Sequence, residues 1–529
     1  MTLAAYLAGV IELAAIVAAL AFGAVRVRAR LLPGWSGAPA RLAETVVALA
    51  LAVWAMEALG AVGLLTEAAL VGLCVALGVG ASLLASPARG DLAGVQVPPS
   101  RFAGRAATAI AALIVVALFT EWAGRAYTTV LYGMYGFDSL WYHMPFAARF
   151  AQQESLTGLH FTSPALLTWF YPASSELFHT AGIMVTGRDI LSPFVNFGWL
   201  AAALLAAWCL GRPWGAGPAA VAGVGVVLGA GVFADQAGEA RNDAPGTFFL
   251  LASAALLVNA MPTRTLPRLV VGAWPLALAG VAAGLAAGTK LNLLAPVAAL
   301  TAGVIVAAPA GRRLAASGAW IAAALAGGGF WFARNLAHVG NPLPWVSSLG
   351  PVSLPGPEDY LEGTREPHAL IRYATDTEVW SEWLFPALDE RFGVLWPAVL
   401  VLALAGAVLA LARGRSAVER VLGWTVLASV AVYPFTPLSA SGPDGMPVGF
   451  ASNLRYLAPV AALALALVPI AAARFGPRWR DATLAALVVV GAAAALGSDE
   501  VVRLVSGRAA VAAGLAVAAL LAGAWAVQS

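Results

Sequence analysis

The stretch Ala279-Gly-Val-Ala-Ala-Gly-Leu-Ala-Ala-Gly288-Thr-Lys290 is almost entirely small and apolar, and it ends in the only lysine of the chain. It belongs to one of about fifteen apolar runs, each offering about the 20 residues that a bilayer-crossing helix needs. These runs are centred near residues 14, 52, 76, 115, 200, 225, 252, 279, 300, 324, 403, 429, 464, 490 and 517. The sequence therefore predicts an all-α polytopic membrane protein with about 13–15 transmembrane helices.

The overall composition agrees with this fold class. Of the 529 residues, 61% are hydrophobic and 11% are charged, and the mean hydropathy is +0.83. Soluble domains carry about 25% charged residues, so this chain has too little charge for an aqueous surface. A soluble enzyme is excluded, and so is a disordered chain, which would need more charge and less apolar content. We expect membrane lipids as partners, and no nucleic acid.

Two connections between the apolar runs are long, at about residues 125–189 and about 335–392. Both are rich in aromatic and polar residues, and tracts of this length in a compact protein usually carry function. The remaining connections are short. The join near Lys290 decides the topology, because one miscounted span there would invert everything that follows.

The positions of the charged residues predict the orientation of the chain. If the N-terminus is external and the spans alternate, the short inner connections contain most of the arginines, among them Arg26, Arg28, Arg30, Arg312, Arg313, Arg413 and Arg415. Cytoplasmic loops are enriched in Lys and Arg. The other connections contain most of the acidic residues. The sequence therefore predicts that both long loops lie outside the cytoplasm.

Common catalytic and metal-binding motifs are absent from the sequence. Cys74 and Cys209 both fall inside apolar runs, which is typical of small buried thiols rather than of a disulfide framework. The chain contains no P-loop, HExxH or GxSxG motif. We therefore look for chemistry among polar residues near the ends of the spans, where ionisable groups are costly and usually functional.

The first candidate segment is Tyr135-Gly-Phe-Asp138-Ser-Leu-Trp-Tyr142-His143-Met-Pro145. Pro145 predicts the first turn of a helix that continues through Arg149, which leaves Asp138 on irregular backbone above the fourth span. Desolvation by the neighbouring aromatic residues would suit the Asp138 carboxylate to accept a proton. The alternative is that Asp138 only caps a helix or pairs with Arg149.

Two further segments carry polar residues. Tyr171-Pro172-Ala-Ser-Ser-Glu176 could line an acceptor groove, and Arg241-Asn242-Asp243-Ala-Pro245 directly precedes an apolar helix. Asp243 would begin that helix, and Arg241 could neutralise a phosphate. An Arg241–Asp243 interaction is the competing interpretation.

Together these segments resemble the GT-C superfamily of glycosyltransferases that use polyprenyl-phosphate sugars. The resemblance rests on Asp138-x-x-x-Tyr142-His143-x-Pro145, Tyr171-Pro172-x-x-x-Glu176 and Arg241-Asn242-Asp243. Three later segments add to it: Gly284-x-x-x-Gly288-Thr-Lys290-x-Asn292, Arg334-Asn335 with Gly340-Asn341-Pro342, and Arg455-Tyr456 with Pro459. The chain is most similar to the bacterial branch related to protein O-mannosyltransferases and the lipid A aminoarabinose transferase.

The resemblance implies a GT-C-like helical bundle with three parts. Residues 1–105 would form N-terminal transmembrane helices, and residues 106–473 the catalytic core with its two extracytoplasmic loops. Residues 474–529 would form C-terminal transmembrane helices. It also implies an integral protein of the bacterial plasma membrane, with its active site facing outside the cytoplasm.

The resemblance further implies an inverting transfer of a sugar to an acceptor hydroxyl, with Asp138 as the general base. The donor would be a sugar linked to a polyprenyl phosphate, and the acceptor a glycan, a lipid or a protein. The expected donor- and phosphate-binding residues are Lys290, Arg241, Arg455, Arg334, His143 and Tyr456. The expected acceptor or second acidic site comprises Asp243, Asn242, Glu176 and Tyr142. A divalent metal is left open, because two carboxylates without a His cluster define no particular ion.

Other interpretations remain at this stage. Lys290 could instead extend its amine to the membrane interface. A transporter or flippase for a lipid-linked or polar substrate would place charges in the middle of spans and use broken helices that face one another. A member that only binds a lipid carrier is a third possibility.

Overall fold

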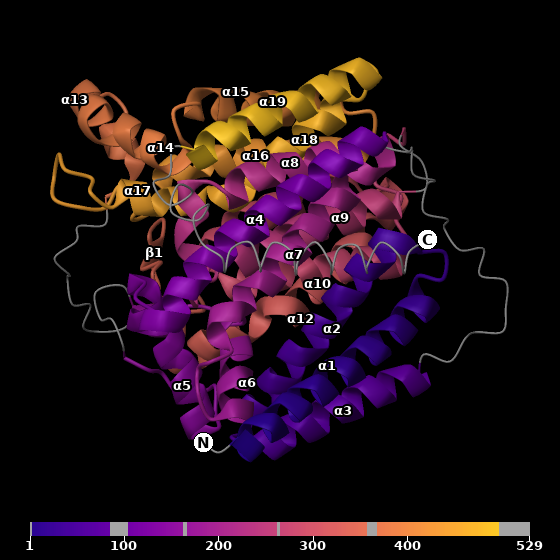
Figure 1. The fold of residues 1–529 in the computed structure, drawn as a ribbon, viewed down its shortest axis with the longest axis vertical. Coiled ribbons are helices and arrows are strands. Elements are labelled where there is room, and N and C mark those ends of the chain that lie inside the picture. The colour runs from indigo at the N-terminus through magenta and orange to yellow at the C-terminus, as the bar shows by residue number, and fades with distance from the viewer. Residues whose placement is uncertain (1–2, 85–103, 162–166, 262–264, 357–367, 497–529) are drawn as a thin grey trace.

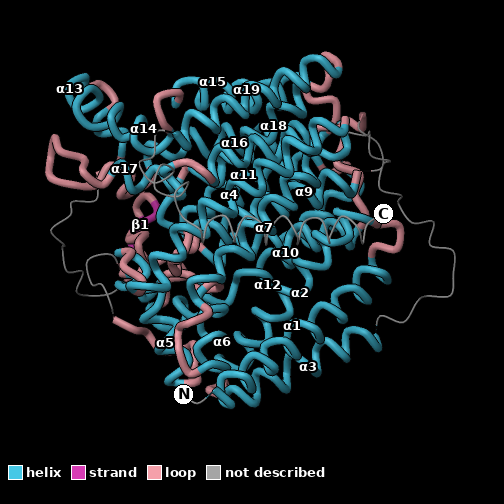
Figure 2. The backbone as a smooth tube through the Cα atoms, in the orientation of Figure 1, coloured by secondary structure: helices cyan, strands magenta, loops and turns pink. Residues whose placement is uncertain are grey.

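The computed structural model describes residues 3–84, 104–161, 167–261, 265–356 and 368–496. The structure is 77% helical, and Figure 2 shows how completely helices fill the described part. Within those ranges the regular β-structure is one small antiparallel hairpin, β1 (Ser348–Leu349) with β2 (Val352–Ser353). The prediction of an all-α protein is confirmed.

Seven of the described helices are long and apolar enough to cross a membrane. They are α1 (Leu3–Leu31), α2 (Gly37–Ala61), α4 (Arg105–Tyr132), α7 (Ser192–Gly211), α9 (Asp243–Ala260), α12 (Arg313–Val339) and α15 (Trp396–Arg413). Phe450–Tyr456 and α18 (Ala458–Ala472) meet the same criterion when taken together, as a helix pair bent by 57° that would count as an eighth span. The chain is therefore a polytopic membrane protein.

The remaining predicted runs also form helices, but several of these are shorter than a bilayer. They are α3 (Glu67–Leu84), α8 (Gly217–Leu228), α10 (Ala273–Thr289), α11 (Leu294–Ala307), α16 (Ala417–Val432) and α19 (Pro477–Leu496). Every predicted centre from residue 14 to residue 490 lies inside a helix. The run near residue 517 lies outside the described residues. By length and composition the described part has seven or eight spans, so 13–15 stays a prediction.

The chain reverses direction at Lys290, the join on which the topology depends. The backbone N–H of Leu269, just before α10, donates to the carbonyl oxygen of Ala307, the last residue of α11, over 2.9 Å. The end of α11 therefore lies beside the start of α10, and the two helices form an antiparallel hairpin with Lys290 in its turn. Figure 1 shows the helices running across the view, with α5, β1, α14 and α17 gathered at its left end.

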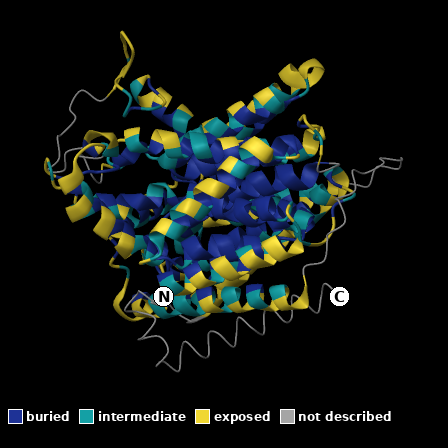
Figure 3. Ribbon diagram, turned by 90° about the horizontal axis from the view of Figure 1, so that it is seen from above, coloured by how far each residue is buried: buried dark blue, intermediate teal, exposed yellow. Residues whose placement is uncertain are grey.

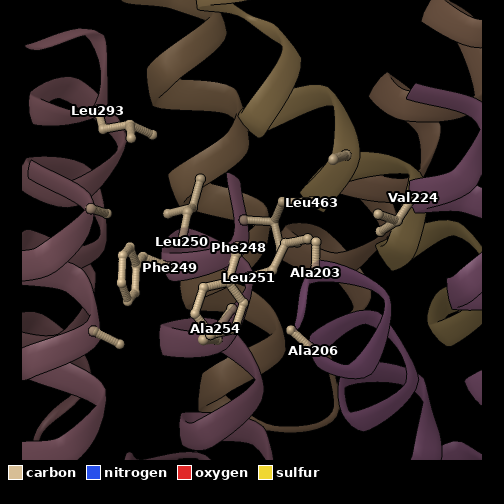
Figure 4. Packing of buried hydrophobic residues seen from close by; sticks show 14 of the residues in the cluster. Ala203, Ala206, Val224, Phe248, Phe249, Leu250, Leu251, Ala254, Leu293 and Leu463 are labelled. Atoms are coloured by element: carbon tan, nitrogen blue, oxygen red, sulfur yellow. The ribbon is translucent and has the colours of Figure 1, made fainter. Parts of the chain in front are cut away.

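The core of the bundle surrounds α9, in which all 18 residues are buried. Figure 4 shows Phe248, Phe249, Leu250 and Leu251 packed against neighbouring helices. Figure 3 shows buried residues in the centre of the bundle and exposed residues on the outer helices. The exposed residues include large hydrophobic side chains on the spans, such as Ile11, Leu113 and Val401, which suit a lipid environment.

Small residues allow α10 and α12 to approach each other closely. A Cβ added to Gly284 would collide with the carbonyl oxygen of Ala324, and one added to Gly288 would lie 2.9 Å from the Cα of Gly328. Glycine at both positions lets the two backbones touch, as small residues do between helices in membranes.

Both long connections begin later than predicted and contain helices. α4 continues to Tyr132 and ends at Gly133 (φ +86°), and α12 continues to Val339 and ends at Gly340 (φ +72°). Glycine adopts positive φ without strain, so these residues, rather than the loss of hydropathy, end the helices. The first connection contains α5 (Met144–Gln153) and α6 (Glu176–Thr186); the second contains α13 (Thr377–Val379), α14 (Phe385–Phe392) and the hairpin.

Candidate functional site

Asp138 lies at the start of a helical segment rather than on irregular backbone, which corrects the prediction. Its φ of −65° and ψ of −37° are helical, and the π-turn η1 (Ser139–His143) follows it and leads into α5. Pro145 stands in the first turn of α5, as predicted. In an α-helix a proline ring would clash with the carbonyl group four residues earlier. The wider π-turn, closed by Met144 N–H donating to Ser139 O, carries the helix up to that proline.

The carboxylate of Asp138 forms an ion pair with Arg455. Arg455 Nη1 lies 2.5 Å from Asp138 Oδ2, and both residues are buried. The predicted alternatives are both wrong. The Asp138 side chain caps no helix, and Arg149 donates instead to Gln152.

A second buried ion pair joins Asp243 and Lys290. Asp243 is the first residue of α9, and Gln236 Nε2 also donates to its Oδ2 over 2.9 Å. Arg241 pairs with Asp235, with 3.3 Å between Nη1 and Oδ2. Arg241 and Asp243 therefore do not pair with each other, because Arg241 pairs with Asp235 and Asp243 pairs with Lys290. Lys290 is buried and its amine is bonded to Asp243, so it does not extend to the membrane interface.

The two ion pairs belong to one group of charges. Tyr456 lies under both cations, with its ring centroid 5.8 Å from Lys290 Nζ and 5.7 Å from Arg455 Cζ. Asn292 Nδ2 donates to Tyr456 O over 2.9 Å and so ties the Lys290 turn to the Arg455 segment. We call the following five residues the charge cluster: Asp138, Arg241, Asp243, Lys290 and Arg455. The end of the bundle that carries the cluster is called the site end.

The electrostatics of the charge cluster correct the expected basicity of Asp138. Burial raises the pKa of Asp138. Electrostatic interactions have the opposite and larger effect, and they come from Arg455, Arg241, His143 and Lys290. The net pKa of Asp138 therefore lies well below its ordinary range. Desolvation alone predicted a carboxylate ready to accept a proton. In the resting site the surrounding cations instead hold Asp138 as a weak base.

His143 and Glu176 form a buried pair beside Asp138. His143 Nδ1 is hydrogen-bonded to Glu176 Oε1, and Ser175 Oγ donates to Glu176 Oε2 over 2.8 Å. Burial, and then the charge of His143, lower the pKa of His179, also on α6, to about 3. The sequence had predicted that Glu176 lines an acceptor groove. In the structure both of its carboxylate oxygens already have partners, His143 and Ser175.

Tyr142 is also buried and lies beside this pair. Its ring is 4.0 Å from that of His143 and meets Tyr171 edge to face at 5.7 Å. Burial, and then the negative charge of Asp138, raise the pKa of Tyr142 well above its ordinary value. Tyr142 therefore remains a neutral hydroxyl group near Asp138.

Two predicted binding residues have structural partners instead. Arg334 Nη2 donates to Trp169 O over 2.6 Å, and its guanidinium carbon lies 4.9 Å from the ring of Trp331. Asn242 Nδ2 donates to Thr289 O over 2.8 Å, which joins the start of α9 to the end of α10. The structure therefore places Arg334 against the first long connection, outside the charge cluster.

The sequence prediction missed the residues that hold the Asp138 segment in place. Glu239 Oε1 accepts from the backbone N–H groups of Tyr135 (3.0 Å) and Gly136 (3.1 Å), and Ser139 Oγ accepts from Ala240 N–H (3.0 Å). Asn196 Nδ2 donates to the carbonyl oxygens of Gln236 and Glu239. Two features of the sequence could have indicated these residues. Asn196 is a single asparagine inside an apolar run, and acidic and amide residues, including Gln236 and Glu239, occupy the short turn before α9.

The donor set does not fit a metal ion. Across the ranges that the structure describes, no three His, Cys, Asp or Glu side chains come together as a metal site would require. Asp138 and Asp243 are each paired with a cation, which competes with a metal for the same oxygen atoms.

Comparison with protein-family models, with curated proteins and with solved structures finds no match for this chain. The functional argument therefore depends on the chemistry of the charge cluster.

Proposed function

We propose that this chain is an inverting glycosyltransferase of the GT-C type, which moves a sugar from a polyprenyl-phosphate donor to an acceptor hydroxyl. The observation that carries the proposal is the charge cluster itself. It brings together two carboxylates and three cations, all of them buried, at or near the ends of helices in the bundle. Charge this close to a bilayer is costly and usually functional.

The cluster supplies the two parts that the reaction needs. Asp138 would take the proton of the acceptor hydroxyl, whose oxygen attacks the anomeric carbon from the face opposite the phosphate. The bond between the anomeric carbon and the phosphate oxygen breaks, and polyprenyl phosphate leaves with the electron pair. Lys290, Arg455 and Arg241 would stabilise the negative charge that grows on this leaving group.

The neighbouring residues would support these roles. Asp243 holds the amine of Lys290 through their ion pair, and the Tyr456 ring lies beneath both Lys290 and Arg455. Glu176 would orient His143, whose charge acts on Asp138. Tyr142 would meet the acceptor with its neutral hydroxyl group.

The arginines at the opposite end of the bundle support the proposed orientation. Arg420 Nη2 donates to Pro267 O, and Arg474 pairs with Glu419, both near the connections that lead into α10 and α16. Arg312, Arg313 and Arg413 also lie at this end. Since cytoplasmic loops are enriched in arginine, we propose that this end faces the cytoplasm of a bacterium and that the site end faces outside.

A transporter or flippase is the second candidate, and one observation favours it. The span that carries Arg455 is broken, with a bend of 57° between Phe450–Tyr456 and α18. Broken helices with ionisable residues at the break are typical of substrate sites in transporters. This function would move a lipid-linked substrate across the membrane without cleaving any bond.

Radiolabelled polyprenyl-phosphate sugars separate the two candidates. Purified protein in nanodiscs is mixed with each donor and a pool of acceptors, and release of polyprenyl phosphate is measured. We expect Asp138→Asn to lose about 10²–10⁴-fold in rate, the usual contribution of a general base. Asp444→Asn is the matched control. It makes the same chemical change at an exposed carboxylate, which is paired with Arg372 and does not belong to the charge cluster.

Two outcomes would contradict the proposal. Asp138→Asn could turn over as fast as the parent protein, which would remove the assigned base. Alternatively, labelled donor could cross the membrane of sealed vesicles with its sugar–phosphate bond intact, which would favour the transporter.

A further inference from the structure

We propose that the resting site masks Asp138 with Arg455, and that a phosphodiester ligand unmasks it by drawing Arg455 and Lys290 to its own oxygen atoms. Asp138 then becomes a stronger base and takes up a proton at mildly acidic pH. This inference rests on the proposed function, because it takes the phosphate of a lipid-linked donor as the ligand. It adds that the base is inactive until the donor has bound.

The first argument is that each principal cation is already occupied by a carboxylate. Arg455 pairs with Asp138 over 2.5 Å, and Lys290 pairs with Asp243. A phosphate that binds these cations must therefore share them or displace the carboxylates. The base and the phosphate site cannot act independently of each other.

The second argument is the balance of charge. The charge cluster contains three cations and two carboxylates. Asp235, which pairs with Arg241, has a side chain that is 49% exposed, so water screens its charge, and the buried groups keep one excess positive charge. A sugar linked to a polyprenyl phosphate is a phosphodiester with one negative charge. Such a ligand would neutralise the cluster, whereas a neutral sugar would not.

The third argument is that buried nitrogen atoms in and beside the cluster are unused. Arg455 Nε, Arg241 Nε and His143 Nε2 are buried and have no hydrogen-bond partner among the described residues. Their position beside the two ion pairs makes these atoms available to a ligand that enters the cluster. The two non-ester oxygens of a phosphodiester each accept several hydrogen bonds and would satisfy such donors.

The fourth argument is that the exchange needs little movement. Lys290 and Arg455 both lie within 6 Å of the same ring, that of Tyr456, at 5.8 and 5.7 Å from its centroid. Lys290 also acts electrostatically on Asp138, the partner of Arg455. Side-chain rotation can therefore transfer either cation from a carboxylate to a ligand placed between them.

The proton uptake follows from the groups that face Asp138. These are Arg455 and Tyr456 from the bent span, Arg241 from the turn before α9, Lys290 from the α10–α11 turn, and His143 and Tyr142 from its own segment. The cations now hold the pKa of Asp138 well below its ordinary range. An anion that engages them adds a negative charge nearby and weakens the ion pair, and both effects raise that pKa.

Isothermal titration calorimetry tests this coupling on the full chain in nanodiscs. The probe is decyl methyl phosphate, a phosphodiester that keeps one negative charge throughout the pH range used. Titrations at about pH 5 in two buffers of different ionisation enthalpy give the number of protons exchanged on binding. We expect uptake that approaches about one proton per ligand and that vanishes near neutral pH.

Dimethyl phosphate is the second probe, and it separates a lipid headgroup from a free phosphate. Weaker binding with the same proton uptake would show that the cluster recognises the phosphate and that the chain only adds affinity. Binding of decyl methyl phosphate without proton uptake would mean adsorption to the apolar surface, and it would overturn the proposal.

One variant and one control assign the proton to Asp138. Asp138→Asn should bind decyl methyl phosphate at least as tightly as the parent, because Arg455 is freed, but should lose the proton uptake. Asp444→Asn, the control from an exposed ion pair outside the cluster, should retain the uptake. Uptake that persists in Asp138→Asn would contradict the proposal.

An infrared difference spectrum of the parent protein covers the case in which Asp138→Asn does not fold. Ligand binding at about pH 5 should produce the carbonyl band of a protonated carboxylic acid, and absence of that band would overturn the proposal. Proton uptake without sugar transfer from any labelled donor would leave the unmasking intact and refute the transferase. Transfer without proton uptake would refute the unmasking alone.

Discussion

Replacing Lys290 by methionine tests how strongly the Lys290–Asp243 pair stabilises the fold. The substitution removes the charge and shortens the unbranched side chain by one heavy atom. It leaves the Asp243 carboxylate, whose side chain has no exposed surface, with Gln236 as its remaining hydrogen-bond donor. Removing one partner of a buried ion pair usually costs about 3–5 kcal/mol.

We expect a loss near about 3 kcal/mol, the lower end of that range, because two groups compensate in part. Gln236 still donates to Asp243, and Arg455 acts electrostatically on the same carboxylate. In the double variant Lys290→Met/Asp243→Asn neither charge remains. We expect it to recover about 2 kcal/mol relative to the sum of the single variants.

The measurement is the free energy of unfolding by SDS titration in mixed micelles. The control is Arg372→Met, which breaks an ion pair with Asp444 that is about half exposed on both sides. Such surface pairs contribute about 0–1 kcal/mol. The argument that the pair is buried and interdependent is wrong in either of two cases. Lys290→Met could lower the free energy of unfolding no more than this control does. Alternatively, the loss in the double variant could equal the sum of the losses in Lys290→Met and Asp243→Asn.

Three further predictions concern the site and the helix contact beneath it. Because the cations lower the pKa of Asp138, its ion pair stabilises the fold fully above about pH 4, and this stabilisation is lost as the pH falls further. In Asp138→Asn the free energy of unfolding, measured against pH, should therefore fall less steeply at acidic pH. Glu176→Gln removes the charge that holds His143 and should lower kcat about tenfold with KM unchanged, measured as initial rates. Gly284→Val should lower the free energy of unfolding by about 1–3 kcal/mol, because its side chain meets the carbonyl group of Ala324.

The sequence alone determined the class of the protein and the regions where chemistry could occur. Apolar runs predict helices by local counting, and each run from residue 14 to residue 490 is a helix in the structure. Pro145 correctly predicted the start of α5 for a local reason, since proline has no N–H and a fixed φ. The scarcity of charge also made Asp138, Asp243 and Lys290 stand out.

Only the tertiary structure decided which charges meet. Local patterns suggested Arg149 for Asp138 and Arg241 for Asp243, whereas the actual partners are Arg455 and Lys290. Arg334 looked like another phosphate ligand, but it holds the carbonyl group of Trp169. Ion pairs and hydrogen bonds depend on separations of a few ångströms, and those are set by how helices distant in the sequence pack together. For the same reason the low pKa of Asp138 could not be read from its aromatic neighbours in the sequence, because the cations that lower it come mainly from segments distant in the chain.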